Sequence, residues 1–241
     1  MRIAMWSGPR NLSTAMMYAF AQRSDCAVWD EPFYAAYLQA TGLDHPMRDA
    51  ILAAGLRDPE AVIRTCTGPV PNGKTVFYQK HMTQHMIPGF DRGWIDGLTN
   101  VFLIRDPARV IASYAAKREN PTLDDIGFRQ QAELFDAVCQ RNGAAPPVLD
   151  SVDIRADPGA ALALLCDAIG LDFQEAMLTW PAGGNAADGV WAAHWYGAVW
   201  RSTGFAEPEG PLPKVADALR DVHDAAQPYY QRMLAHALRP A

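Results

Sequence analysis

Residues 8–14 combine backbone freedom, hydroxyl groups and one cation. They are Gly8, Pro9, Arg10, Asn11, Leu12, Ser13 and Thr14. The apolar run at residues 2–7 predicts a strand before them, and the spacing of residues 13–23 predicts a helix after them. Unpaired N–H groups at a helix N-terminus carry roughly +0.5 of a charge and bind anions. The segment therefore predicts a phosphate-binding loop, with a plain strand-to-helix turn capped by Ser13 as the alternative.

The loop lacks groups that nucleotide hydrolases use to hold metal-bound phosphates. In the pattern Gly-x4-Gly-Lys-Ser/Thr, counted from Gly8, the last three positions are Ser13, Thr14 and Ala15. The phosphate-binding lysine and the hydroxyl that binds magnesium are therefore missing. This disfavours a metal-dependent kinase or nucleotide hydrolase, which remains an alternative.

A second set of anion-binding side chains is expected at the end of a later strand. Residues 100–105 predict a buried strand that ends at Arg105, and Asp106 with Pro107 marks a helix start. Ser113 follows Arg105 by eight residues. Open parallel sheets bind ligands at the carboxyl ends of their strands, so Arg105 is expected to face the same site as the first loop.

Together these segments resemble the phosphate-binding elements of the sulfotransferases. That family's loop usually reads Pro-Lys/Arg-Ser-Gly-Thr/Ser-Thr/Ser, and residues 9–14 match four of its six positions, with Asn11 and Leu12 as the departures. Arg105 and Ser113 resemble the pair that holds the donor's 3′-phosphate. The resemblance covers residues 1 to about 118. It implies that the loop residues bind 3′-phosphoadenosine 5′-phosphosulfate (PAPS) and that no metal is required.

Two residues at strand ends are candidates for the base that removes the acceptor's proton. Glu31 lies in a Glu-Pro turn like that of many bacterial sulfotransferases, and His81 lies in a segment similar to the family's Lys-x-His sequence. We favour Glu31, because aromatic neighbours can raise a carboxyl pKa by excluding water. Arg10 is expected to stabilise charge on the leaving phosphate. The alternatives are that Glu31 neutralises Arg10 or caps a helix, and that His81 is a core histidine.

Two neighbours of these candidates have other possible roles. Lys80 either meets the donor's sulfate or pairs with a carboxylate at the sheet edge. His85 follows His81 by four residues, which suggests a metal-binding pair, but the sequence offers no third ligand. No metal site is therefore predicted.

The elements that must position these groups alternate along the chain. Short apolar runs predict buried parallel strands at residues 2–7, 26–30, 75–80, 100–105 and 147–152. Helical spacing predicts helices at residues 13–23, 107–118, 122–142, 158–169 and 215–238. This alternation predicts an α/β fold of three layers, α/β/α, around a doubly wound parallel sheet of the P-loop-like kind. Residues 1–241 are expected to form a single domain, because no linker is evident.

Residues 180–213 break this pattern. They hold four of the seven tryptophans and several glycines. Such a segment is either a lid over the ligand or a surface segment anchored by its aromatic side chains.

Composition limits the classes of partner. The net charge of −6 disfavours a nucleic-acid surface, and the four cysteines are too scattered for a zinc knuckle or a redox pair. No apolar run reaches the roughly 18 residues of a membrane span. The first apolar run leads directly into the loop and leaves no room for a leader, so a cytoplasmic location is expected.

These observations favour a PAPS-dependent sulfotransferase that acts on a hydroxyl or amine of a small-molecule acceptor. A catalytically inactive nucleotide-binding module is a further alternative, supported by Leu12 in place of glycine. The sequence determines neither the acceptor nor the oligomeric state, because specificity in such folds lies in variable loops.

Overall fold

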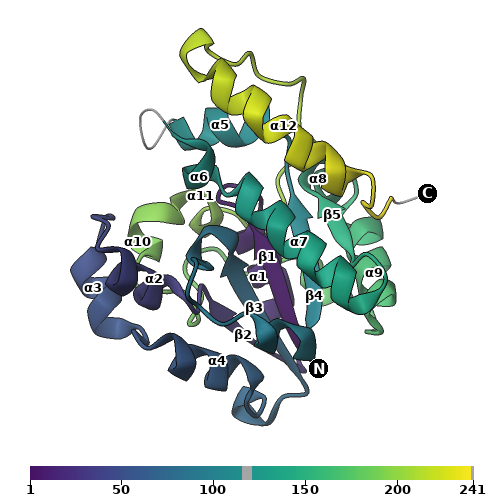
Figure 1. Cartoon of the computed structure of the whole chain (residues 1–241). Coiled ribbons are helices and arrows are strands. Elements are labelled where there is room, and N and C mark those ends of the chain that lie inside the picture. The colour runs from purple at the N-terminus through teal and green to yellow at the C-terminus, as the bar shows by residue number, and fades with distance from the viewer. Residues whose placement is uncertain (116–120, 240–241) are drawn as a thin grey trace.

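Apolar runs ending in polar residues form the strands of one parallel sheet with helices on both faces (Figure 1). The structure is a computed structural model and describes residues 1–115 and 121–239. In these ranges the sheet has five strands in the order β2-β3-β1-β4-β5. They are β1 (Arg2–Ser7), β2 (Cys26–Asp30), β3 (Val76–Met82), β4 (Thr99–Ile104) and β5 (Val148–Asp150).

The parallel register brings the carboxyl ends of the strands to one edge of the sheet. The central strand β1 pairs with β3, where Met5 lies opposite Lys80, and with β4, where Ser7 lies opposite Leu103. The residues that follow these strands, among them Gly8 and Arg105, therefore leave the sheet at the same edge.

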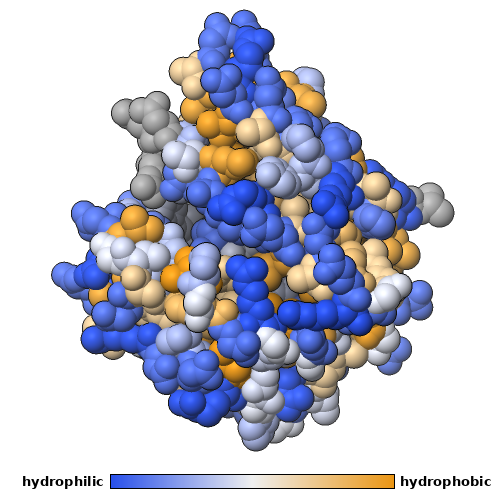
Figure 2. Space-filling model, in the orientation of Figure 1, coloured by the Kyte–Doolittle hydropathy of each residue, from blue (hydrophilic) through white to orange (hydrophobic). Residues whose placement is uncertain are grey.

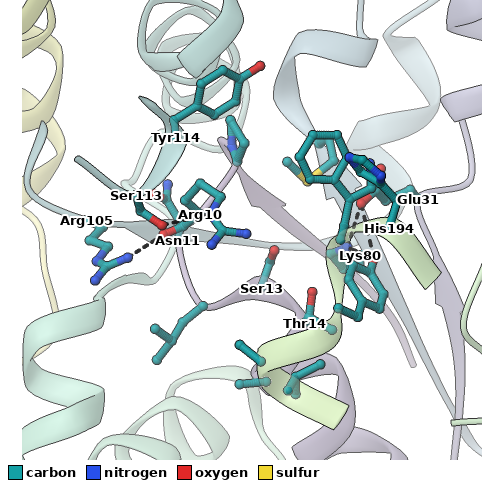
Figure 3. A pocket seen from close by; sticks show the side chains of 18 of the residues that line it. Arg10, Asn11, Ser13, Thr14, Glu31, Lys80, Arg105, Ser113, Tyr114 and His194 are labelled. Carbon is teal, nitrogen blue, oxygen red and sulfur yellow. Dashed lines mark hydrogen bonds and ion pairs between the residues drawn. The ribbon is translucent and has the colours of Figure 1, made fainter. Parts of the chain in front are cut away.

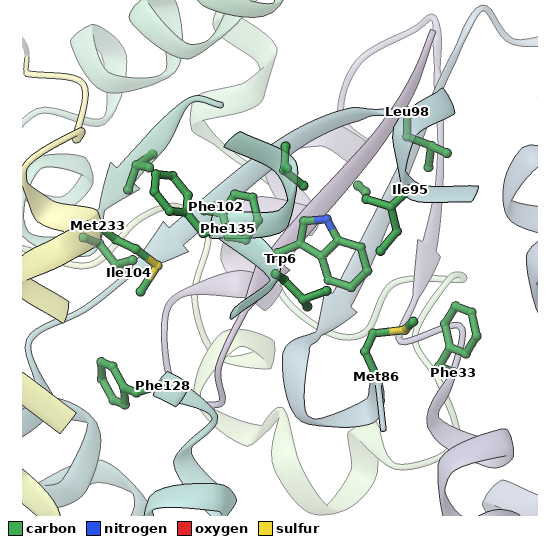
Figure 4. Packing of buried hydrophobic residues seen from close by; sticks show 14 of the residues in the cluster. Trp6, Phe33, Met86, Ile95, Leu98, Phe102, Ile104, Phe128, Phe135 and Met233 are labelled. Carbon is green, nitrogen blue, oxygen red and sulfur yellow. The ribbon is translucent and has the colours of Figure 1, made fainter. Parts of the chain in front are cut away.

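Side chains alternate along each strand and fill a core on each face of the sheet. From β1, Ile3 and Met5 join the cluster formed with α1 (Ser13–Ala21) and α9 (Pro158–Ile169). Trp6 instead joins the cluster formed with α7 (Phe128–Asn142) and α12 (Arg220–Leu234). Figure 4 shows the second cluster, in which Trp6 lies among aliphatic and aromatic side chains. Burial on both faces explains why the strands are apolar throughout.

Twelve α-helices are present in the described ranges. They are α1 (Ser13–Ala21), α2 (Tyr34–Thr41), α3 (Arg48–Ala54), α4 (Pro59–Thr67), α5 (Pro107–Ala115), α6 (Leu123–Ile126), α7 (Phe128–Asn142), α8 (Ser151–Ala156), α9 (Pro158–Ile169), α10 (Ala192–Trp195), α11 (Gly197–Trp200) and α12 (Arg220–Leu234). None of the helices described is both long and apolar enough to traverse a bilayer. In the view of Figure 2 the surface is mostly hydrophilic, with apolar side chains in scattered patches.

The α/β prediction is confirmed, and two predicted elements need correction. The strand predicted at residues 147–152 ends at Asp150, because the side chain of Asp150 accepts a hydrogen bond from the Val152 N–H at 3.1 Å and begins α8. The helix predicted at residues 122–142 divides into α6 and α7 at Gly127, whose φ is 71°.

Other predicted boundaries shift by a few residues: the helix predicted at residues 13–23 spans Ser13–Ala21, and the strands predicted at residues 75–80 and 100–105 span Val76–Met82 and Thr99–Ile104. The last helix is shorter than residues 215–238 and spans Arg220–Leu234. The helix predicted at residues 107–118 is observed as Pro107–Ala115, and the remainder of that prediction lies outside the described residues. Asp106 caps this helix as expected, accepting from the Ala108 N–H at 2.8 Å.

Close packing at the end of β1 predicts that Gly8 is needed for stability. Gly8→Ala should lower the free energy of unfolding by about 1–3 kcal/mol, the usual cost of overpacking, because an added Cβ would lie 2.6 Å from the carbonyl oxygen of Ile126. Urea denaturation measures this difference. Gly97→Ala is the control, since no described atom lies within 4 Å of its added Cβ. Equal stability of Gly8→Ala and the wild type would contradict the prediction.

Candidate functional site

A cavity of about 590 Å³ opens at the carboxyl edge of the sheet (Figure 3). Its wall is built from the loop after β1, from the ends of three other strands and from the segment that follows residue 193. Nine of the predicted site residues line it: Pro9, Arg10, Asn11, Leu12, Ser13, Thr14, Glu31, Arg105 and Ser113. In the part of the chain that the structure describes, two other predicted site residues, Gly8 and His81, do not line the cavity.

The loop reaches α1 through two residues in the left-handed backbone region. Arg10 and Leu12 each have a φ of 64°. This region costs a residue with a side chain about 1–2 kcal/mol, whereas glycine reaches it freely. Leu12, where the similar loops have glycine, therefore adopts a conformation that glycine favours. Strain of this kind is typical of functional sites.

The N-terminus of α1 opens toward the cavity without a side-chain cap. The N-cap residue is Leu12, and none of the described side chains bonds to the first amides of the helix. Ser13 is the first helical residue rather than the cap, which excludes the plain turn capped by Ser13. These amides and the hydroxyls of Ser13 and Thr14 form one group of donors at the cavity wall.

Buried amide side chains hold the start of the loop against the sheet. The Gly8 N–H donates to Oε1 of Gln131 at 3.2 Å, and Nε2 of Gln131 donates to the Leu103 carbonyl at 2.8 Å. Asn11 is 1% exposed and donates to the same carbonyl at 3.3 Å. Gly8 therefore holds the loop in place and does not line the cavity. Asn11 also helps to hold the loop, through its side-chain amide, although it lines the cavity as well. Gln131 was not among the predicted residues, since it lies in the first turn of the helix at Phe128–Asn142 with no local signal of its role.

The two predicted phosphate-binding segments meet at the cavity. Nε of Arg10 donates to Oγ of Ser113 at 2.8 Å, and Nη1 of Arg105 donates to the carbonyl oxygen of Arg10 at 2.8 Å. Burial and the charge of Arg105 lower the pKa of Arg10. Two positive charges that affect each other in this way are stabilised by an anion, which the cavity has room to admit.

A buried ion-pair network lies at the other end of the cavity. Nζ of Lys80 donates to Oδ1 of Asp30 at 2.9 Å, to Oε1 of Glu31 at 2.7 Å and to the hydroxyl of Tyr196 at 2.5 Å. That hydroxyl in turn donates to Oδ2 of Asp30 at 2.8 Å. Burial by itself lowers the pKa of Lys80, but the two carboxylates together have the larger effect, so the pKa is raised. Burial raises the pKa of Asp30, and the positive charge of Lys80 only partly offsets this rise.

Glu31 reaches the cavity from a strained backbone. Its φ is 40°, and its N–H donates to the Lys80 carbonyl at 3.0 Å. Its partner is Lys80 rather than Arg10, whose side chain bonds to Ser113. Lys80 thus pairs with carboxylates at the sheet edge, one of the two roles considered for it.

His81 lies on the opposite face of β3 from Lys80, because successive strand residues point to opposite sides. It is 2% exposed and stacks on Trp6 with ring centroids 4.5 Å apart. Burial and nearby His85 lower the pKa of His81 to about 3. Its Nε2 meets Oε1 of Gln79 at 3.1 Å. The structure therefore gives His81 the environment of a core histidine and no access to an acceptor.

Aromatic and histidine side chains form the wall beyond Glu31. His85 is stacked between Tyr34 and Tyr37, with centroid distances of 4.7 and 4.8 Å. The segment at residues 194–206 adds His194, Trp195 and Tyr196. These last three residues lie in the segment 180–213, for which a lid over the ligand was one of the two expectations, but none of them was singled out, because nothing local distinguishes a tyrosine that lines a cavity from one in the core. In the described part of the chain no group of side chains is arranged to hold a metal ion.

Comparisons with known proteins show the family to which the chain belongs. A family model described as "Sulfotransferase domain" matches residues 1–237. Two curated relatives from Arabidopsis thaliana are named branched-chain-amino-acid aminotransferase-like proteins 2 and 1. The first is 34% identical over 235 residues and the second 35% over 234. These alignments cover 97% of this chain but 41% and 42% of the relatives, so the chain spans about two fifths of their length.

Three solved structures share the fold. The sulfotransferase domain of the Synechococcus PCC 7002 olefin synthase has a TM-score of 0.50 and 18% identity over 95% of this chain and 94% of its own. The sulfotransferase domain from the curacin biosynthetic pathway has a TM-score of 0.55 and 15% identity, with coverages of 99% and 98%. A sulfotransferase from Alicyclobacillus acidocaldarius has a TM-score of 0.54 and 11% identity, with coverages of 98% and 96%.

The buried network predicts a large stability loss when its cation is removed. Lys80→Met should lower the free energy of unfolding at pH 7 by about 3–5 kcal/mol, because Asp30 and Glu31 lose their ammonium partner. The deficit relative to wild type should shrink as the pH falls, since burial raises the pKa of Asp30 and the protonated form needs no cation. Urea denaturation at several pH values measures both effects.

Lys74→Met is the matched control for this variant. The Lys74 ammonium is exposed and bonds to the Ser24 carbonyl, so its loss should change the unfolding free energy by about 0.5 kcal/mol or less. A similar small effect of Lys80→Met would show that the network contributes little.

Proposed function

This chain belongs to the sulfotransferase domain family, and on that premise we propose that it transfers a sulfuryl group from PAPS to a small acceptor. The acceptor group is a hydroxyl or an amine. The observation that supports this most directly is the meeting of residues 8–14 with the segment from Arg105 to Ser113 at one cavity. The chemistry of the donor set also fits, since the lining side chains of these segments offer N–H and O–H groups and no carboxylate.

The two ends of PAPS would meet different parts of this wall. The first amides of α1, with Arg10, Ser13 and Thr14, suit the 5′-phosphosulfate. Arg105 and Ser113 suit the 3′-phosphate, because both side chains lie at the far side of Arg10 from the α1 N-terminus (Figure 3).

Transfer requires an attacking oxygen or nitrogen, a base and a stabilised leaving group. The acceptor atom forms a bond to sulfur while the bond between sulfur and the bridging phosphate oxygen breaks in line. The electron pair of that bond remains on the phosphate, where Arg10 and the loop donors stabilise it. Glu31 takes the acceptor's proton, and Lys80 holds the carboxylate in place at the cavity wall.

The donor assignment predicts a preference for 3′-phosphorylated nucleotides. Calorimetry should show that adenosine 3′,5′-bisphosphate binds at least about tenfold more tightly than 5′-AMP, and that Mg·ATP binds weakly. Arg105→Ala should remove this preference, because one charged contact to the 3′-phosphate is lost. Arg64→Ala, which changes an arginine on α4 with a side chain 69% exposed, is the control and should keep it. Equal binding of the bisphosphate and 5′-AMP by the wild type would refute PAPS as the donor.

The base assignment predicts different effects of two substitutions. Glu31→Gln should lower kcat about 10²- to 10⁴-fold, the usual contribution of a general base, with bisphosphate affinity nearly unchanged. His81→Asn should alter stability more than kcat, since His81 is buried among rings. Assays with labelled PAPS and a panel of phenols, alcohols and amines measure kcat. Full activity of Glu31→Gln would exclude Glu31 as the base.

A further inference from the structure

Three arginines converge on one carboxylate next to the cavity. Nη1 of Arg155 lies 2.9 Å from Oε1 of Glu209, and Nε of Arg109 lies 3.0 Å from Oε2. Nη2 of Arg105 pairs with Oε1 as well. The arginines come from three places in the fold: the end of β4, α5 and α8. The Glu209 side chain is 1% exposed, so the carboxylate is enclosed by its partners.

The backbone around Glu209 is attached to the same arginines. Arg155 donates through Nε to the carbonyl of Glu207 at 2.7 Å, and Arg109 donates to the carbonyl of Gly210. The residues just before them, Gly204, Phe205 and Ala206, line the cavity. The 204–210 segment is therefore one continuous piece of chain, with one end at the cavity wall and the other held by the arginine cluster.

The cluster has more positive charge than Glu209 neutralises. With three guanidinium groups and one carboxylate, the cluster has an excess of about two positive charges. A phosphate monoester has a charge of about −1.5 to −2 at pH 7 and would neutralise this excess. Nε of Arg105 is buried with no hydrogen-bond acceptor among the described residues. A carboxylate offers two oxygens to these donors, whereas a phosphate monoester offers three. The charge and the donor count therefore suit a phosphate better than the carboxylate that is bound there.

We propose that Glu209 occupies the subsite of the donor's 3′-phosphate in the free protein and leaves it when the donor binds. This inference rests on the proposed function, in which Arg105 binds that phosphate. A phosphate bound at Arg105 would lie beside the Glu209 carboxylate, and the like charges of the two anions repel each other, so the two compete for the arginines. The apparent affinity for a 3′-phosphorylated nucleotide is then reduced by the fraction of molecules in which Glu209 holds the arginines. Glu209 thereby sets how strongly the protein distinguishes nucleotides with and without a 3′-phosphate.

The test compares two ligands on three proteins. Calorimetry gives the affinities of adenosine 3′,5′-bisphosphate and 5′-AMP for the wild type, Glu209→Gln and Glu207→Gln. Glu209→Gln keeps the shape of the side chain but removes the competing charge, so the ratio of the two affinities should rise about tenfold. Glu207→Gln makes the same change two residues away at an exposed residue, and it should leave the ratio unchanged.

The outcomes separate this inference from the proposed function. A ratio that rises in Glu209→Gln alone supports the competition. A wild type that prefers the bisphosphate, with an unchanged or smaller ratio in Glu209→Gln, overturns the competition and leaves the PAPS assignment intact. An equal rise in both variants attributes the effect to net charge and also overturns it. No preference for the bisphosphate in the wild type overturns both proposals.

A second measurement uses the wild type and does not depend on how well a variant folds. Hydrogen exchange should become faster at residues 207–210 when the bisphosphate binds, because the arginines release the segment, and slower at residues 8–14. With 5′-AMP only residues 8–14 should change. Slower exchange at residues 207–210 with the bisphosphate would overturn the proposal.

Discussion

The parallel pairing of β1 with β3 on one side and β4 on the other determines where each polar group of the site lies. In this register the loop after Ser7 leaves the sheet between Lys80 on one neighbour and Arg105 after the other. Gln131 then joins the Gly8 N–H to the Leu103 carbonyl of β4, so the start of the loop is held to the sheet it leaves. A shift of one residue in either pairing would turn every side chain of the strand to the other face and remove the site.

The cavity has opposite charge at its two ends. Next to one end Lys80 pairs with the carboxylates of Asp30 and Glu31, and next to the other Glu209 pairs with three arginines. The first arrangement suits the acceptance of a proton and the second suits the binding of phosphate. The net charge of −6 is compatible with the proposed binding of an anionic nucleotide, because charges beyond roughly 10 Å are largely screened.

The sequence predictions succeeded where the limits of an element depend on residues that are neighbours in the chain. The bounds of β1, β2 and α9 agree with the prediction, since each is an apolar run or a capped helix whose limits depend on neighbouring residues. The end of β5 was mispredicted because Asp150 caps a helix as readily as it ends a strand. The division at Gly127 was missed, because one glycine in a long helical pattern is ordinarily tolerated.

By itself the sequence determined the place of the loop at residues 8–14 in the cavity wall, the place of Arg105 just after a strand and the α/β order, because these depend on residue type and on near neighbours in the chain. Only the tertiary structure decided that Lys80 holds Glu31 while His81 faces the core, and that a buried carboxylate faces Arg105. The contacts responsible join residues far apart: Gly8 with Gln131 across 123 positions, Lys80 with Tyr196 across 116 and Arg105 with Glu209 across 104. No local pattern records such pairs, since they exist only once the sheet and its helices are packed.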